Sequence, residues 1–372
     1  MMGPAAMAVQ RRFGLRAALL AGTGLMFAAL FASAYATQVW HLFLSQGVGF
    51  GWGMGLLYAP ASSALPPWFT SRRSLAVGIS TAGAGCGGLV YSLAANAAVQ
   101  RWGLPWTYRI LALCSLGANL LSASLLRDLS RKRHAAQPPP PKFRMRNLGR
   151  IQVLLVVAWG ITTELGYITL LYSLPHYATT IGLTAQQGSL ANALLNVGLA
   201  LGRPIIGYAS DLFGRINTAM MMTAICALFC FALWIPANGF PLLATFALLV
   251  GGLCGIFWST ITPILAECVG LGQLSSTFGF VCTLMVFPTT FAEPIAMTLV
   301  GASGDTYLTA QIFVGCVFAV GASSLWVLRA WKIVGTRTKA EQVSESTRTS
   351  WLQSPKVSHW PWLSALFSLD RV

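Results

Sequence analysis

Ten long apolar runs, separated by more polar segments, make up most of the chain. They cover residues 13–35, 41–65, 74–98, 107–127, 151–174, 187–208, 218–236, 241–266, 274–300 and 308–330. Each run is long enough to cross a hydrocarbon core of about 30 Å as an α-helix, which rises about 1.5 Å per residue. None alternates between apolar and polar residues as the strands of a membrane barrel do. The sequence therefore predicts an all-α polytopic membrane protein with ten transmembrane helices.

The composition excludes an ordinary soluble domain. Of the 372 residues, 55% are hydrophobic and only 9% are charged, whereas soluble domains carry about 25% charged residues. The formal net charge is +15, but the basic residues lie between apolar runs, which argues against a nucleic-acid partner. The eight cysteines fall in apolar stretches and the four histidines show no metal-ligand spacing. We therefore expect neither a cofactor nor a metal.

Lysine and arginine positions predict the orientation. If the N-terminus is cytoplasmic, all but three of the 24 basic residues fall in cytoplasmic segments, the exceptions being Arg101, Arg109 and Arg203. By the positive-inside rule both termini are then cytoplasmic, and we expect the plasma membrane in preference to an internal one. A cleaved signal peptide ending near Ala36 is the alternative, but the first apolar run exceeds the roughly 7 to 15 residues of a typical h-region.

A basic, proline-rich segment divides the chain. Residues 128–150 are rich in lysine and arginine and include four prolines in a row, a composition typical of a linker between bundles. The expected organisation is a four-helix bundle in 1–127, a six-helix bundle in 151–330 and a disordered, Ser/Thr-rich cytoplasmic tail in 331–372.

The segment after run 187–208 carries a distinctive motif. Gly207, Asp211, Gly214 and Arg215 form the pattern G-x-x-x-D-x-x-G-R. Gly207 permits close helix approach, Gly214 permits a tight turn, and the charged pair can contact neighbouring helix ends. The pattern resembles the loop signature of the major facilitator superfamily, which implies a transporter built from two helical bundles.

A second motif surrounds Arg72 and Arg73. Aromatic residues precede the arginines, and Leu75 begins a Leu-Ala-x-Gly sequence that leads into a glycine-rich helix. With residues 291–296, this region resembles the fungal form of the monocarboxylate-porter branch of the superfamily. Alignment on these motifs implies that run 13–35 corresponds to the third helix of a twelve-helix transporter. The first two helices are then expected to be missing, and Arg11 takes the acidic position of the first-half loop signature.

Arg203 is the main candidate for substrate binding. A charged side chain at the centre of a bilayer costs at least about 2.5 to 3.5 kcal/mol, so its presence indicates a function. Asn192 and Asn196 share its helix face, and a guanidinium can bind a carboxylate through two hydrogen bonds. The resemblance implies that Arg203 binds the substrate carboxylate, although Leu199 stands where animal members carry an acidic partner. The alternative is that Arg203 extends to the cytoplasmic face and anchors the loop.

Glu164 is the candidate for proton coupling. It lies near the middle of its run, where desolvation disfavours the charged form of a carboxylate. A purely structural role is the alternative. Glu267, Glu293 and Arg109 lie near run ends, where we expect their side chains to contact water.

These features predict a secondary active transporter of a small, monocarboxylate-like organic anion that works by alternating access, with the proton as candidate coupling ion. The expected partners are that anion, the proton and the lipid bilayer. One alternative is an exporter of an apolar metabolite, which would not require an arginine in its site, and another is a transport-inactive truncated homologue. An enzyme is not expected, because the sequence lacks clustered histidines or aspartates.

Overall fold

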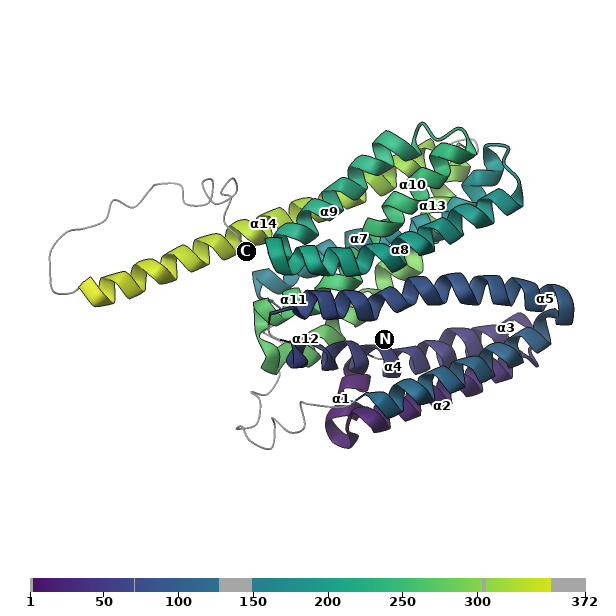
Figure 1. The fold of residues 1–372 in the computed structure, drawn as a ribbon, viewed down its shortest axis with the longest axis horizontal. Coiled ribbons are helices and arrows are strands. Elements are labelled where there is room, and N and C mark those ends of the chain that lie inside the picture. Colours follow the sequence, from purple (N-terminus) through teal and green to yellow (C-terminus); the bar gives the residue numbers. More distant parts are fainter. Residues whose placement is uncertain (1–2, 70, 127–148, 303–305, 349–372) are drawn as a thin grey trace.

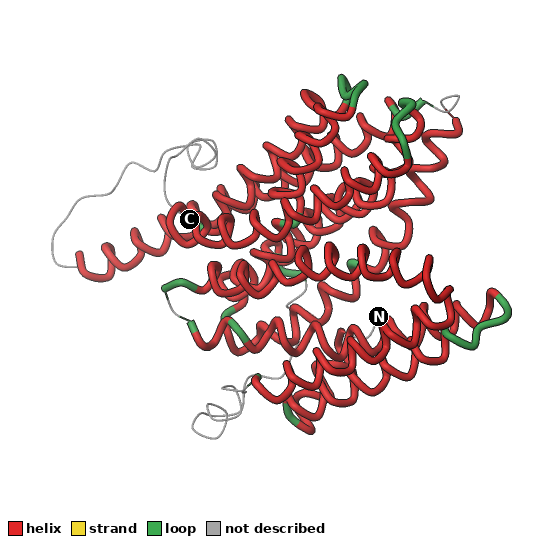
Figure 2. The backbone as a smooth tube through the Cα atoms, turned by 45° about the vertical axis from the view of Figure 1, so that its right-hand side comes forward, coloured by secondary structure: helices red, strands yellow, loops and turns green. Residues whose placement is uncertain are grey.

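The computed structural model describes residues 3–69, 71–126, 149–302 and 306–348. No strand occurs within these ranges, in agreement with the predicted all-α fold. The described helices form two bundles that lie side by side with their axes roughly parallel (Figure 1, Figure 2). The predicted linker at 128–150 lies almost wholly outside the described residues.

The first bundle contains the helices that precede the predicted linker. They are α1 (Gly3–Phe13), α2 (Leu15–Ser33), α3 (Val39–Leu42), the π-helix η1 (Phe43–Phe50), α4 (Gly51–Ala64), the short 3₁₀ helix η2 (Pro66–Trp68) and α5 (Arg73–Leu125). The last of these consists of two arms that meet at Gly103, where φ is 77°, and the chain turns back there (Figure 1).

The second bundle contains the remaining helices. They are α7 (Ile151–Thr180), α8 (Ala185–Phe213), α9 (Arg215–Phe229) with η4 (Cys230–Trp234), α10 (Phe240–Cys254), α11 (Ile256–Val269), α12 (Leu271–Leu284), α13 (Val286–Ala302) and α14 (Leu308–Arg348). α10 with α11, and α12 with α13, each make one span with a local interruption.

The predicted spans are largely confirmed. Within the described residues, nine helical segments are long and apolar enough to cross a membrane, and they match nine of the ten predicted runs. Run 41–65 is helical too, but it is divided among α3, η1 and α4, so no single piece reaches the required length.

Two features differ from the sequence prediction. The helix α1 precedes the first predicted run, and the sequence pattern does not predict it because its eleven residues are too few and too polar to form a span. At the other end α14 continues to Arg348, so the predicted disordered tail of 331–372 is helical over 331–348. Residues 349–372 lie outside the described part of the chain.

The two bundles meet most extensively where α5 packs against α8. Glycines allow the two backbones to approach closely. A methyl group at Gly78 would lie 2.4 Å from the carbonyl oxygen of Arg203, and one at Gly207 would lie 2.5 Å from the carbonyl oxygen of Ser74. Because no side chain larger than hydrogen fits at these positions, the contact depends on glycine, as in other close helix pairs in membranes.

A matched pair of glycines tests this contact. We expect Gly78→Ala to lower the melting temperature of the purified protein, because overpacking costs about 1 to 3 kcal/mol. Gly83 lies on the same helix, and a methyl group there would have no atom within 4 Å. Gly83→Ala should therefore leave the melting temperature unchanged or raise it through better helix propensity. Thermal unfolding followed by size-exclusion chromatography measures both, and equal melting temperatures for the two variants would contradict the assigned contact.

Candidate functional site

Arg203 lies in the second half of α8, at the junction of the two bundles. Only 3% of its surface is exposed, so it does not extend to the membrane surface. Its Nη1 donates a hydrogen bond to the carbonyl oxygen of Thr81 on α5, at 2.5 Å. Gly255, at the junction of α10 and α11, leaves room for the guanidinium, because a methyl group there would lie 2.6 Å from Nε of Arg203. This nitrogen is buried and makes no hydrogen bond within the described residues.

Glu164 lies in the interior of α7, as its sequence position predicts. Its exposed fraction is 1%, and Oε1 makes no hydrogen bond within the described residues. The side chain of Trp258 on α11 is a hydrogen-bonding neighbour of the carboxylate, and Arg203 is close enough to attract it electrostatically. The ion pairs within 4 Å among the described residues include neither Glu164 nor Arg203. The guanidinium and the carboxyl group therefore lie in the same interior region without direct contact.

Residues of both bundles surround these two charges. The ring of Tyr58 on α4 meets that of Trp258 edge to face, with the ring centroids 5.3 Å apart. Oγ1 of Thr81 lies 3.4 Å from Oγ of Ser259 on α11. Tyr58 also interacts electrostatically with both Arg203 and Glu164. Sequence reasoning missed Tyr58, Thr81 and Ser259, because ordinary polar and aromatic residues within an apolar run carry no mark of the partner across the bundle interface.

The two predicted amides lie nearer the N-terminus of α8. The side-chain nitrogen of Asn196 donates to the carbonyl oxygen of Asn192, at 3.0 Å, and its Oδ1 faces Gly88 of α5. Oδ1 of Asn192 is buried without a hydrogen bond in the described part of the chain. Seven residues of helix separate Asn196 from Arg203, which corresponds to about 10 Å along the axis. Asn196 and Arg203 thus both face α5, and the structure places the amide and the guanidinium at different depths.

The predicted loop signature joins the bundles at one end, which we call the basic end because Arg72, Arg73, Arg215 and Lys332 lie there. The carboxylate of Asp211 accepts hydrogen bonds from the backbone N–H groups of Ser74 and Leu75, at 3.1 and 2.9 Å. These amides open α5, so the carboxylate caps a helix N-terminus and offsets its positive dipole. Gly214 follows with φ at 96°, a backbone conformation that glycine adopts without strain.

Arg215 at the start of α9 also contacts residues of α5 and α11. Its Nε donates to Oγ of Ser74 at 3.1 Å, and its Nη1 contacts Oε1 of Glu267 at 2.5 Å. The other oxygen of Glu267 contacts Nζ of Lys332, also at 2.5 Å. Glu267 is exposed, as expected of a residue at the end of a run, and its side chain also links α9 to α14 through two cations.

The two arginines of the second motif have different surroundings. Nε of Arg73 donates to the carbonyl oxygens of Pro66 and Phe69, at 3.0 and 3.2 Å, and so holds the turn that precedes α5. Arg72 is exposed at the N-cap position of α5. Of the predicted loop residues, Asp211, Arg215 and Arg73 thus make contacts that fix the basic end.

Polar residues also gather at the opposite end of the second bundle. Nδ1 of His176 and the hydroxyl of Tyr307 share a hydrogen bond. Burial, with a contribution from Glu293, raises the pKa of Tyr307 to about 12, so its phenol keeps its proton at neutral pH. Arg109, in the first bundle, lies over the rings of Tyr35 and Trp106 at 5.0 and 4.9 Å, a cation–π arrangement.

Comparison with known proteins identifies the class of molecule that this fold represents. The family model described as the Major Facilitator Superfamily matches residues 1–171 and 154–369. The chain belongs to the Major Facilitator Superfamily. It is therefore a multi-pass membrane protein of a family of secondary transporters, and not an enzyme.

The similar curated proteins are fungal transporters. The chain is 32% identical over 348 residues to the "Probable transporter MCH2" of Saccharomyces cerevisiae, an alignment that covers 91% of this chain and 73% of that protein. It is 30% identical to the "Uncharacterized transporter ESBP6" of the same yeast, with coverage of 95% and 54%. The chain thus spans about half the length of the second relative.

Solved structures share the fold. A structure of the E. coli fucose:proton symporter FucP superposes with a TM-score of 0.70 at 14% identity, covering 87% of this chain and 86% of that one. The proton:xylose symporter XylE, bound to 6-bromo-6-deoxy-D-glucose, gives a TM-score of 0.71 at 13% identity, with coverage of 87% and 82%. At such identities the likeness concerns the arrangement of the helices.

The cap formed by Asp211 can be tested at single amides. Asp211→Asn removes a charged acceptor, and loss of such a bond costs about 1.5 to 3 kcal/mol. We expect amide hydrogen exchange at Ser74 and Leu75 to accelerate by about tenfold or more. Glu267→Gln weakens the exposed ion pairs and leaves the cap in place, so exchange at the two amides should stay at the wild-type rate. Equal acceleration in both variants would show that the ion pairs, and not the cap, hold the start of α5.

Proposed function

We propose that the chain transports a small organic anion of the monocarboxylate type. The observation that carries this proposal is the buried guanidinium of Arg203, with its Nε free of hydrogen bonds among the described residues. A buried cation without a paired anion is costly, and a carboxylate supplies two oxygens in the geometry that a guanidinium binds. Glu164 is nearby but makes no direct ion pair with Arg203, which leaves the guanidinium available to a substrate.

The inter-bundle contacts suggest how binding would be coupled to movement. Arg203 is bonded to the backbone of Thr81, which belongs to the other bundle. A bound carboxylate would compete for the same guanidinium and weaken this connection between α8 and α5. Substrate binding would then lower the free energy needed to separate the bundles at the basic end, as alternating access requires.

Glu164 is the proposed site of proton coupling. The carboxylate is 1% exposed and lies near Arg203. An acidic residue within a membrane, close to the substrate site, is typical of proton relays in transporters. In this proposal the proton on Glu164 and the anion at Arg203 are carried together, so that the pair crosses the membrane with no net charge.

Orientation is proposed from the distribution of basic residues. All but three of the 24 lysines and arginines belong to the basic end or to segments connected to it, and the positive-inside rule places such an end in the cytosol. Both termini would then be cytoplasmic, and we propose the plasma membrane as the location.

A second candidate is export of an apolar metabolite. One relative, 24% identical over 330 residues, is the "Fujikurins efflux protein" of Gibberella fujikuroi. Such a substrate would contact the aromatic side chains of Tyr58 and Trp258 and would not require Arg203. A transport-inactive chain is the third candidate, and absence of uptake for every compound in a monocarboxylate panel would favour it.

Replacement of Arg203 distinguishes these candidates. In proteoliposomes, uptake of labelled monocarboxylates should be lost in Arg203→Ala, because charge-assisted hydrogen bonds to a substrate contribute about 1.5 to 3 kcal/mol, or about ten- to hundredfold in KM. Arg203→Lys keeps the charge without the bidentate geometry and should retain a small part of the activity. Arg109→Lys, at the other end of the molecule, serves as the control and should transport normally. Normal transport by Arg203→Ala would remove the carboxylate-binding role.

Replacement of Glu164 tests the coupling. We expect Glu164→Gln to abolish the stimulation of uptake by an inwardly directed proton gradient, because the side chain can no longer gain and lose a proton. Exchange of labelled for unlabelled substrate needs no net proton movement and should continue. A gradient response equal to that of the wild type would exclude Glu164 as the proton carrier.

A further inference from the structure

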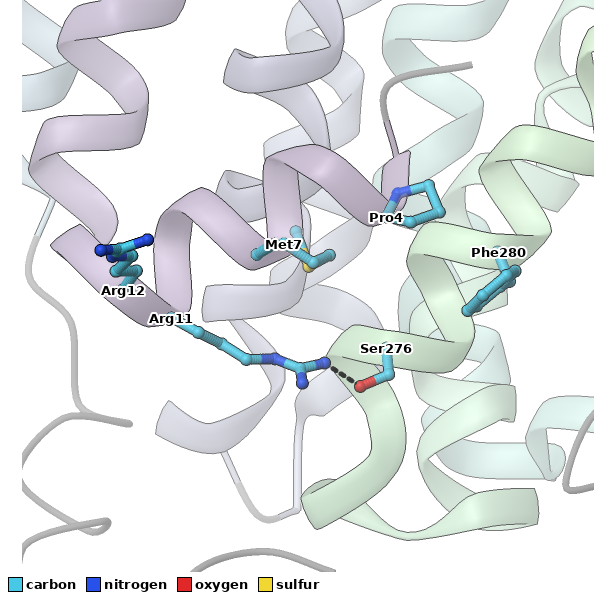
Figure 3. Close-up of a pocket in the computed structure, with 7 residues that line it drawn as sticks. Pro4, Met7, Arg11, Arg12, Ser276 and Phe280 are labelled. Carbon is cyan, nitrogen blue, oxygen red and sulfur yellow. Dashed lines mark hydrogen bonds between the residues drawn. The ribbon is translucent and has the colours of Figure 1, made fainter. Parts of the chain in front are cut away.

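A pocket of about 440 Å³ lies at the basic end, between α1 and the first turns of α12. Its polar lining consists of Arg11, Arg12 and Ser276, and its apolar lining includes Met7 and Phe280. Figure 3 shows Arg11 extending from α1 across the pocket to Ser276 on α12, and Nη2 of Arg11 donates a hydrogen bond to this hydroxyl. None of these residues takes part in the site around Arg203.

The pocket lies on the outer surface of the bundles. Met7 is 1% exposed and packs into a core cluster with Ala59 and Phe278, so this face of α1 points inward. Ala8, Arg11 and Arg12 lie on the exposed part of the same helix. The pocket therefore opens on the exposed side of α1, away from the core cluster around Met7.

The depth of the pocket corresponds to the membrane interface. The arginines end α1 just before the span Leu15–Ser33 begins, and Ser276 lies in the second turn of the span Leu271–Ala302. Five residues of helix correspond to about 7 Å, so the pocket extends from the headgroup level into the start of the hydrocarbon core. The ring of Phe13 is 62% exposed, and the guanidinium of Arg12 lies 5.5 Å from its centroid in a cation–π arrangement.

The positive charge of the pocket lacks an acidic partner among the described residues. Gly14 joins α1 to α2 with φ at 93°, as Gly214 joins α8 to α9 with φ at 96°. At the junction of α8 and α9, Asp211 caps the N-terminus of α5. At the junction of α1 and α2, Arg11 faces α12, which has neither a side-chain cap nor an acidic residue in its first turn.

An anion would offset this concentration of positive charge. The ion pairs of the described residues include neither Arg11 nor Arg12. The two guanidinium groups favour a bound phosphate. The apolar side of the pocket, with Ala8 and Phe280, suits the acyl chains that a lipid phosphate carries, whereas a soluble phosphate would not cover it.

We propose that this pocket binds the phosphate of an anionic phospholipid from the leaflet at the basic end. Cytoplasmic leaflets are rich in such lipids, and each nearby arginine favours their binding. The headgroup lies between Arg11 and Arg12, and the acyl chains follow Ala8 and Phe280. Because the pocket joins α1 of one bundle to α12 of the other, the lipid holds the basic end closed. It takes the place, at the junction of α1 and α2, of the carboxylate that Asp211 provides at the junction of α8 and α9.

Native mass spectrometry of the purified full chain tests this proposal, with phosphatidylserine and phosphatidylcholine as probes. We expect the wild type to retain phosphatidylserine selectively, and the double variant Arg11→Gln/Arg12→Gln to bind it at least about tenfold more weakly. Arg16→Gln is the matched control, because Arg16 is an exposed arginine just beyond Gly14 that does not line the pocket. It should bind phosphatidylserine as the wild type does.

Two further variants change the shape of the pocket and the chemistry of its charges separately, with lipid retention as the measurement. Ala8→Phe places a ring in the pocket without a change in charge and should also reduce lipid retention, while Arg11→Lys/Arg12→Lys should keep it. Each variant is checked for a monodisperse elution profile. Undiminished retention of phosphatidylserine in both the double variant and Ala8→Phe would overturn the proposal. Displacement of the lipid by millimolar inorganic phosphate would overturn the assignment to a lipid and indicate a soluble phosphate compound.

Discussion

The close contact of the α5 and α8 backbones determines the arrangement of the basic end and of the central charges. Because glycine at positions 78 and 207 lets the helices approach, the carbonyl oxygen of Thr81 comes within reach of Arg203. The same approach brings the first amides of α5 to the carboxylate of Asp211. A wider separation would break both sets of hydrogen bonds at once. Packing, capping and the placement of a buried charge therefore depend on one helix pair.

In the proposed function, two groups that are costly to bury remain available for binding in the protein interior. Arg203 and Glu164 are almost fully buried without a direct ion pair. A close pair would be more stable alone, but it would have to be broken before either residue could bind a substrate or a proton. Separation at a moderate distance reduces the attraction that a ligand must overcome. The hydrogen bond to Thr81 and the neighbouring Trp258 offset part of the cost of burial.

The bundle architecture could be predicted from the sequence because bilayer thickness sets the length of every apolar run. The role of Asp211 at a helix end could also be expected, since its motif has fixed spacing. Contacts between distant segments could not be predicted from the sequence. Tyr58 and Thr81 lie in apolar runs and have no local feature that identifies Trp258 or Arg203 as partners.

Two other features could not be predicted, one because the contacting residues are far apart in the sequence and the other because the helix is short. Glu267 is exposed, as its position at the end of a run predicts, but its two cationic partners, Arg215 and Lys332, could not be identified because they are 52 and 65 residues away. The helix α1 has no counterpart among the predicted runs because it is short and amphipathic, and its inward face becomes apparent only when α12 is packed against it.

The length of α14 separates its C-terminal end from the apolar, membrane-spanning part of the protein. Its apolar portion ends at Gly335, but the helix continues to Arg348 and projects beyond the other helices (Figure 1). Residues 336–348 correspond to about 20 Å of helix, which is roughly twice the Debye length of about 10 Å at 0.1 M salt. The helix thus works as a spacer. The end of this helix is therefore screened by salt from the charges near Gly335.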